Sequence, residues 1–263
     1  MDSPEFVLSS LHPAEDKNSP VPYIPRARYC IYRGMWAELP ENKHNEAPQN
    51  DRVYESDLLT FTTDVRMRKI PEIFASSQGH GDVSQSQGSG GGGPVEAVFW
   101  IKDVMTQWRF KGQAYIVGQD VEGSGEESSG TRTVKTKVGE RMRVVDGHKK
   151  ANWSWEKEIT AHFGNLSPAM RGSFKNPVPG SPISIPLADQ SLSLGQKVTD
   201  LNDEIARRNF RVVIIKPDEV EQLDLTEPDT ARRWKFTYVG LDSQYAGSKG
   251  DQIGEWKKEE LWP

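Results

Sequence analysis

The sequence is poor in cysteine and in metal-ligand patterns. Cys30 is the single cysteine, so no internal disulfide and no cysteine-based zinc site can form. It lies in an apolar stretch, which fits a reducing compartment. The five histidines are scattered, with no pair at metal-ligand spacing. We therefore expect no metal site.

Long apolar runs and a strong net charge are also missing. No run of 18 apolar residues occurs, and the first residues lack the charged-then-apolar pattern of a signal peptide. We expect a soluble, cytoplasmic protein with no membrane contact. The 263 residues include 33 Lys and Arg against 38 Asp and Glu, a formal net charge of −5, which argues against a nucleic-acid binder. Local clusters of cations on an acidic chain indicate a small anionic ligand instead.

Residues 58–69 have the character of an anion-binding strand end. An apolar, hydroxyl-rich strand runs into a turn that carries an aspartate and three cations. Thr62 and Thr63 offer hydroxyl donors, and Arg68 offers a planar guanidinium that matches a phosphate. Lys69 adds a point charge. The alternative interpretation is a basic turn on a solvated surface.

Alternating polar and apolar residues predict a mainly β protein of the α+β class. With six or seven strands, short helices and no βαβ rhythm, we expect one domain over residues 1–263, an antiparallel barrel with peripheral helices. Two Gly/Ser-rich tracts, at about 76–94 and 118–132, are interpreted as flexible insertions. The predicted strands are 5–11, 23–36, 57–63, 94–100, 106–117, 209–216 and 232–239, and the predicted helices are 66–75, 153–163, 167–174 and 196–208.

Two of the predicted strands carry further cations. Arg28 and Arg33 are five residues apart, so they point to opposite faces of a regular strand. They could reach one ligand only across the strand end or through a bulge. On the strand 106–117, Gln107 and Arg109 share one face.

The order of these motifs resembles the pyridoxamine 5′-phosphate oxidase-like FMN-binding proteins. The resemblance is to the branch defined by its flavin domain rather than by proven oxidase activity. It implies a split β-barrel and a homodimer, with FMN in a cleft shared by the two subunits. The matching motifs are Arg28-x-x-x-x-Arg33-Gly, Phe61-Thr-Thr-Asp-x-Arg-x-Arg-Lys69, Gln107-x-Arg-x-x-Gly112 and Arg171-x-Ser-Phe.

The resemblance also implies roles for individual residues. The implied cofactor-binding residues are Arg28 and Arg33 beside the flavin, Phe61, Thr62 and Thr63 along it, Arg68 and Lys69 on its phosphate, and Gln107 from the partner subunit. Arg109 and Arg171 are candidates for substrate contact, and either could equally form a surface ion pair. No catalytic residue is identified.

The sequence departs from the oxidase at several places, including Thr62 in place of an aromatic residue and Glu260 in place of a C-terminal arginine. Met67 stands where the oxidase has a serine, Thr237 replaces a flavin-contacting tryptophan, and residues 242–247 lack the substrate-gripping Arg-x-His. We therefore predict an FMN-dependent oxidoreductase that transfers hydride between the flavin and an unknown small molecule. The alternatives are a pyridoxamine or pyridoxine 5′-phosphate oxidase, and a non-catalytic flavin-binding module whose insertions contact a partner. A deazaflavin in place of FMN also stays open.

Overall fold

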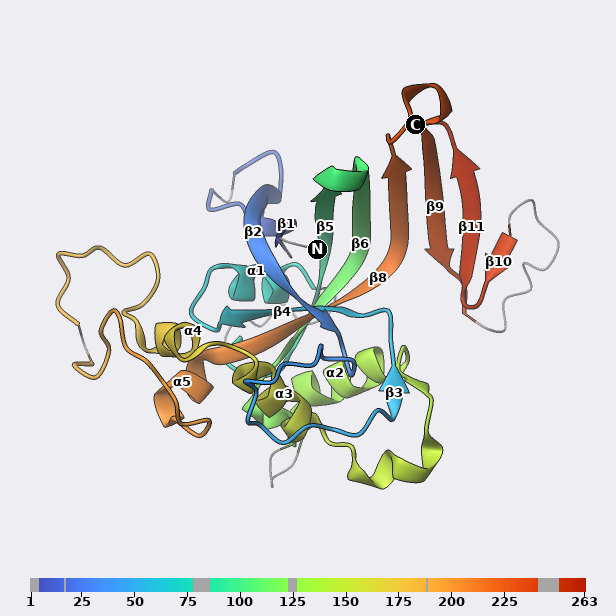
Figure 1. Cartoon of the computed structure of the whole chain (residues 1–263). Coiled ribbons are helices and arrows are strands. Elements are labelled where there is room, and N and C mark those ends of the chain that lie inside the picture. The colour runs from blue at the N-terminus through green and yellow to red at the C-terminus, as the bar shows by residue number, and fades with distance from the viewer. Residues whose placement is uncertain (1–4, 17, 78–85, 123–126, 188, 241–250) are drawn as a thin grey trace.

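Six antiparallel strands form a closed ring at the centre of the computed structural model (Figure 1). The structure describes residues 5–16, 18–77, 86–122, 127–187, 189–240 and 251–263. The ring order is β8-β4-β2-β1-β5-β6, and β6 pairs with β8 to close it, so no ring strand has a free edge. The ring strands are β1 (Glu5–Pro13), β2 (Tyr23–Met35), β4 (Leu59–Asp64), β5 (Gly90–Ile101), β6 (Thr106–Val117) and β8 (Phe210–Asp224).

The long strand β8 belongs both to the ring and to a flat extension of the sheet. Its second half pairs with β6 on one side and with β9 (Arg232–Tyr238) on the other. The sheet then continues through β11 (Trp256–Leu261) to β10 (Asp251–Ile253), which form the red wing at the upper right of Figure 1. A separate two-stranded sheet joins β3 (Tyr54–Glu55) to β7 (Arg143–Val144).

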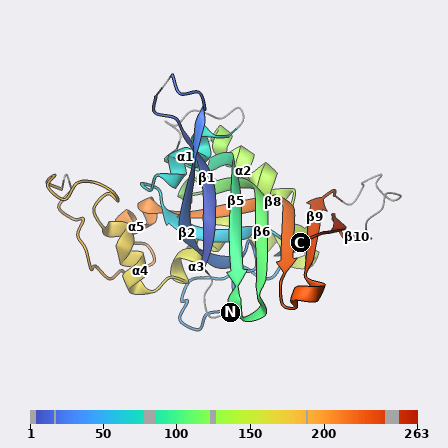
Figure 2. The ribbon, with the colours of Figure 1, turned by 90° about the horizontal axis from the view of Figure 1, so that it is seen from above.

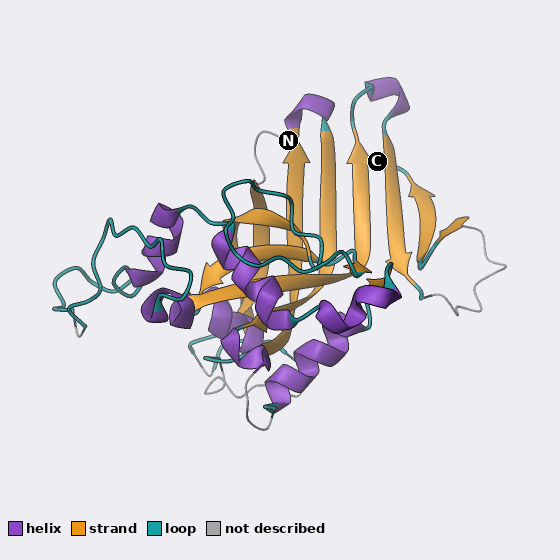
Figure 3. Cartoon of the chain, turned by 60° about the horizontal axis from the view of Figure 1, so that its bottom comes forward, coloured by secondary structure: helices purple, strands orange, loops and turns teal. Residues whose placement is uncertain are grey.

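The helices gather on one side of the sheet, as Figure 3 shows. Seen from above, α1 and α2 lie over one end of the strands (Figure 2). None of the described helices is long and apolar enough to cross a bilayer. The helices are α1 (Lys69–Ala75), α2 (Ser129–Gly139), α3 (Trp155–Gly164), α4 (Pro168–Gly172) and α5 (Glu204–Asn209), with short 3-10 turns η2 (Lys102–Val104), η3 (Gln119–Glu122), η4 (Gly147–Asn152), η5 (Ser173–Lys175) and η6 (Pro228–Thr230).

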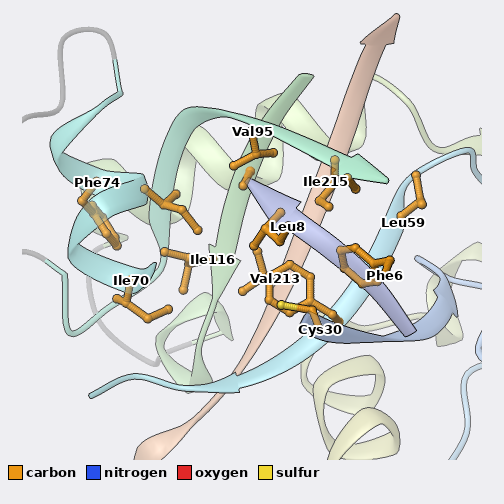
Figure 4. Close-up of a cluster of buried hydrophobic side chains, with 14 of the residues drawn as sticks. Phe6, Leu8, Cys30, Leu59, Ile70, Phe74, Val95, Ile116, Val213 and Ile215 are labelled. Carbon is orange, nitrogen blue, oxygen red and sulfur yellow. The ribbon is translucent and has the colours of Figure 1, made fainter. Parts of the chain in front are cut away.

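Two hydrophobic clusters lie on opposite faces of the ring strands. The first, which we call the barrel core, fills the ring and extends to α1 (Figure 4). The second, the outer core, packs the outside of the ring against α2, α3 and α5. Successive residues of β8 alternate between them: Val213 and Ile215 are in the barrel core, whereas Val212 and Ile214 are in the outer core. Because both faces of β8 are covered at this point, residues 212–215 are continuously apolar.

The predicted fold class and most predicted strands are confirmed. Strands at 5–11, 23–36, 106–117 and 232–239 are all present with small changes at their ends. The strand expected at 209–216 is longer, since β8 continues to Asp224. The helix expected at 196–208 is shorter, because α5 begins only after Asp203, whose side chain accepts the Ala206 N–H.

The glycine tract at 90–93 is a second difference from the sequence prediction. Its composition predicts part of a flexible insertion, yet it forms the start of β5. A side chain at Gly90 would place its Cβ 2.7 Å from Cε1 of Phe74 in α1, and φ there is +149°. Glycine is therefore required by close packing. In the second tract, η3 and the start of α2 are regular; residues 78–85 and 123–126 lie outside the described part of the chain.

Candidate functional site

The turn between β4 and α1 is held by one arginine. Arg66 places its guanidinium on the carboxylate of Asp64, with Nη2 2.6 Å from Oδ2 and Nε 2.9 Å from Oδ1. The same guanidinium donates to the backbone carbonyls of Phe174 and Asn176. Charge-assisted, two-pronged contacts of this kind are among the strongest side-chain hydrogen bonds. Arg66 therefore fixes the turn and has few free N–H groups with which to bind a ligand.

The next two cations of the turn are differently placed. Lys69 donates from Nζ to Oγ1 of Thr63 at 2.9 Å, and burial lowers the pKa of Lys69. Among the described residues, no carboxylate oxygen lies within ion-pair distance of Lys69 Nζ, and the exposed Arg68 side chain contacts no polar group. Two cations and a hydroxyl thus lie at one strand end, and neither cation forms an ion pair with a described carboxylate, although the charges of Glu72 and Asp64 partly offset the effect of burial on the pKa of Lys69. This is the arrangement predicted for a phosphate.

Arg28 is held by α1. Its Nη2 donates to Oε2 of Glu72 at 2.6 Å, and its Nη1 donates to Oγ of Ser10. The Glu72 side chain is only 2% exposed, so this is a nearly buried ion pair. The structure therefore gives Arg28 a partner within the protein, and the predicted contact with flavin would have to use its remaining N–H groups.

Phe61, Thr62 and Gln107 also occupy defined places. Phe61 is 1% exposed in the barrel core, edge-on to Phe6, so its side chain supports β4 from inside and does not face a ligand. Thr62 is half-buried and points to the opposite side of β4. Gln107 pairs with Leu223, whereas Thr63 pairs with Arg211, near the other end of β8. At about 3.3 Å per residue, the path along β8 between these two pairing positions is roughly 40 Å, which is an upper limit because the strand bends (Figure 1).

Three further arginines surround the last turns of α3. Arg33 reaches Sδ of Met170 in α4 at 3.8 Å, and a bulge in β2 between Tyr32 and Met35 falls at this point. The guanidinium carbons of Arg171 and Arg207 lie 5.9 and 5.3 Å from the ring centre of Phe163. We call Arg33, Arg171 and Arg207 the arginine cluster.

The arginine cluster has unused hydrogen-bond donors. Nε of Arg33, Nε of Arg171 and Nη1 of Arg207 are buried and have no partner in the described structure. None of the three pairs with a described carboxylate, and burial lowers the pKa of Arg33 and of Arg207. Buried cations are unfavourable without anions. The sequence pointed to Arg33 and Arg171; Arg207 was missed, because its burial follows from packing that no local pattern reveals.

Arg109 lies in an ion-pair network on the outer surface. Its guanidinium donates to Glu96 on β5 at 2.6 Å and lies 3.4 Å from Glu221 on β8. The hydrogen bond to Glu96 raises the pKa of Arg109. The surface ion pair, rather than substrate contact, is therefore the role that the structure gives this residue.

Comparisons with known proteins agree with the fold. Residues 1–118 match the family model described as pyridoxamine 5′-phosphate oxidase, FMN-binding domain. An uncharacterized protein of Saccharomyces cerevisiae is 20% identical over 255 residues, covering 79% of this chain and 82% of that protein. A pyridoxamine 5′-phosphate oxidase-related, FMN binding protein from Nostoc punctiforme PCC 73102 is similar in structure, with a TM-score of 0.54 and 16% identity over 99% of this chain and 88% of that one.

A more distant structure is PhzG from Burkholderia lata 383, solved with tetrahydrophenazine-1-carboxylic acid, with a TM-score of 0.42 and 12% identity over 100% of this chain and 84% of that one. The family model spans β1 to β6 and so contains the β4–α1 turn with Arg68 and Lys69. The matched domain is an FMN-binding domain, and the predicted split β-barrel is confirmed. Residues 1–118 therefore resemble the pyridoxamine 5′-phosphate oxidase FMN-binding domain, and the chain as a whole shares the split-barrel fold of its structural relative.

Proposed function

We propose that this protein is an FMN-dependent oxidoreductase that transfers hydride between the flavin and a small anionic molecule. The observation that carries the proposal is the pair of cations at the β4–α1 turn, Arg68 and Lys69, which lie at one strand end with Thr63 and form no ion pair with a described carboxylate. When bound, the flavin supplies the redox chemistry itself. The protein then has to bind, orient and shield it.

The cofactor phosphate would lie on this turn. Arg68 can offer two parallel N–H groups to phosphate oxygens, and Lys69 adds a charge that is already oriented by its bond to Thr63. An incoming phosphate would also favour the charged form of Lys69, whose pKa burial otherwise lowers. Arg66 holds the turn in place and need not touch the ligand.

A second copy of the chain would complete the cofactor cleft. Gln107 and Thr63 pair with opposite parts of β8, so we propose that Gln107 meets the flavin bound at the partner's turn. The outer face of the ring carries exposed aromatic residues, with Tyr29 76% and Trp100 48% exposed, on strands flanking β1. Exposed apolar side chains grouped on one sheet face are typical of an interface. We propose that this face forms the homodimer and brings Gln107 to the partner's flavin.

The anionic part of the substrate would bind the arginine cluster. The buried N–H groups of Arg33, Arg171 and Arg207 lack acceptors, and a phosphate or carboxylate would supply them. The same cluster favours a phosphate-bearing substrate, so pyridoxamine or pyridoxine 5′-phosphate oxidation is the second candidate function. Residues 242–247, which lack the oxidase's Arg-x-His, lie outside the described residues.

Replacement of Arg68 tests the cofactor site. The absorbance spectrum of purified protein should show an oxidised flavin, and mass analysis after heat release should identify it as FMN. Arg68→Ala should weaken FMN binding by about 1.5–3 kcal/mol, the usual contribution of a charge-assisted hydrogen bond. Arg132→Ala, an exposed arginine on α2, is the matched control and should bind FMN normally. Unchanged FMN retention in Arg68→Ala would place the phosphate elsewhere.

Two further measurements separate the functional alternatives. Sedimentation should show a dimer, and a stable flavin-loaded monomer would contradict the shared cleft. Release of peroxide after addition of pyridoxamine or pyridoxine 5′-phosphate would support the oxidase. Flavin that stays oxidised with NADH and NADPH, and with every substrate tried, would support a non-catalytic flavin-binding module instead.

A further inference from the structure

A cavity of about 680 Å³ lies between the segment 37–52 and α3. None of the residues assigned to the flavin or to the arginine cluster lines it. Its walls carry the amide side chains of Asn42, Gln49 and Asn50, together with the carboxyl group of Glu158. The cavity is therefore a polar site with no role in the function proposed above.

The buried carboxyl group of Glu158 is the observation that indicates a ligand in this cavity. Its side chain is 5% exposed. Oε2 accepts a hydrogen bond from Nδ2 of Asn50 at 2.9 Å, whereas Oε1 is buried and has no hydrogen-bond partner among the described residues. Burial raises the pKa of Glu158, and the hydrogen bonds from Asn50 and from the backbone N–H of Ala37 only partly oppose that rise. A buried carboxyl oxygen with unused lone pairs is unfavourable unless a donor or a cation reaches it.

No protein cation among the described residues satisfies Glu158. Its nearest basic atom is Nε2 of His162, 3.8 Å from Oε1 and one turn along α3. Burial lowers the pKa of His162 to about 3, so this imidazole is neutral at physiological pH. Lys43 and Arg52 also line the cavity, but both are exposed, and Arg52 lies 3.7 Å from Glu38.

The walls of the cavity are held in place by the protein. Asn50 accepts the Ser154 N–H and donates to the Ser154 carbonyl, and Asn45 donates to the carbonyl of Ala161. Ala37, which lines the cavity next to Glu38, has φ of +66°, in the left-handed region that alanine rarely adopts. Strained backbone of this kind persists where the surrounding structure fixes it, and it is common at ligand sites.

The charges and the amide groups together indicate the kind of ligand. Three carboxyl groups, of Glu38, Glu41 and Glu158, face two cations, of Lys43 and Arg52, which leaves one negative charge in excess when Glu158 is ionised. We propose that this cavity binds a small hydroxylated amine, with its ammonium group beside the carboxyl group of Glu158 and its hydroxyl groups against the amide side chains. Amide groups suit hydroxyls because they both donate and accept.

Glucosamine and glucose form a matched pair of probes, because they differ in one ammonium group. Isothermal titration of the full chain should show glucosamine binding at least tenfold more tightly than glucose. Butylamine should bind more tightly than butanol but less tightly than glucosamine, since it lacks the hydroxyl groups. Equal binding of glucosamine and glucose, or no binding of any of the four compounds at millimolar concentration, would overturn the proposal.

Two variants locate the site. Glu158→Gln keeps the shape of the side chain and should abolish the preference for glucosamine, whereas Glu227→Gln, an exposed glutamate elsewhere, should keep it. Because a substitution of the buried Glu158 can disturb folding, a second variant changes an exposed residue of the cavity. Lys43→Glu replaces a positive charge in the lining with a negative one. It should increase glucosamine affinity several-fold. A folded Glu158→Gln that retains the preference, or an unchanged affinity in Lys43→Glu, would contradict the assignment; FMN retention is expected to stay normal in both.

Discussion

The barrel core and the outer core differ in how completely their polar groups are satisfied. Buried polar groups beside the barrel core bond mainly to one another: Ser10, Arg28 and Glu72 form one hydrogen-bonded group, and only Nδ1 of His12, next to Glu72, lacks a hydrogen-bond partner there among the described residues. More polar atoms without a described partner border the outer core: the indole nitrogens of Trp36 and Trp153, both ring nitrogens of His162, and Oε1 of Glu158. Unsatisfied buried groups are rare in proteins and often mark water or ligand sites. We infer that the barrel core supplies stability and that the layer outside it supplies binding sites.

The arginine cluster and the Glu158 cavity, the two proposed binding regions other than the cofactor turn, both lie outside the barrel core. Both border α3, which packs on the outer core rather than on the interior of the ring. The cofactor turn lies where β4 leaves the ring. A closed barrel can keep its shape while the segments around it change, so function can vary in this layer at small expense in stability.

The largest effect is expected from a cavity in the barrel core. Phe61→Ala removes a ring that is 1% exposed and contacts Phe6 and its neighbours, and should lower the free energy of unfolding by about 3–5 kcal/mol. Chemical denaturation measures this change. Phe61→Leu, which leaves a smaller void, should keep FMN affinity unchanged because the ring packs against Phe6 inside the barrel and is not accessible to a ligand. If a folded Phe61→Leu variant bound FMN more weakly, Phe61 would have to contact the cofactor after all.

The second largest effect is expected in the pH dependence of stability, and it comes from His162, which stacks on Trp36 of the outer core. Burial lowers the pKa of His162 to about 3. Between pH 6.5 and 3 the unfolded chain binds a proton at this position and the folded protein does not. Stability supplied by the neutral histidine is therefore lost as pH falls, by up to about 1.4 kcal/mol per pH unit.

His162→Phe should remove this dependence while keeping the stacked ring. The difference in unfolding free energy between the variant and the unchanged protein should grow steadily in favour of the variant from pH 6.5 downward. Burial raises the pKa of Glu158, which has the opposite slope, but that contribution is common to both proteins and drops out of the difference. His148→Gln, at an exposed position, is the control. Parallel stability curves for His162→Phe and the unchanged protein would mean that the imidazole is not buried as described.

Local sequence patterns predicted what depends on local structure. Alternation located the ring strands, and the cluster of cations after β4 located Arg68 and Lys69 at one turn with Thr63. The pairing of Arg28 with Glu72 could not be predicted, because it depends on how α1 rotates over β1 and β2. The same limit applies to Glu158, which no pattern distinguishes from an ordinary surface glutamate of an amphipathic helix.

Predictions made from amino-acid composition were wrong at two segments whose structure depends on tertiary packing. The glycines at 90–93 have the composition of a linker, but in β5 they allow the backbone to approach α1. Likewise, the residues at 196–203 have helical composition but not helical structure, and the helix starts only where Asp203 can cap it. In both cases tertiary contacts outweigh local preference.

The smallest effect tests whether the two layers open independently. Ser154 caps α3 by accepting the Lys157 N–H, while Glu122 accepts the N–H groups of Trp155 and Glu156. Ser154→Ala should lower stability by only about 1 kcal/mol, since the second cap remains. Hydrogen exchange should become faster in the first turn of α3 and stay unchanged in β4 and β8, whereas Ser181→Ala should change neither. Equal acceleration in α3 and in the ring strands would mean that the outer layer unfolds only together with the barrel, in which case its unsatisfied polar groups would be as rigidly held as the barrel core itself.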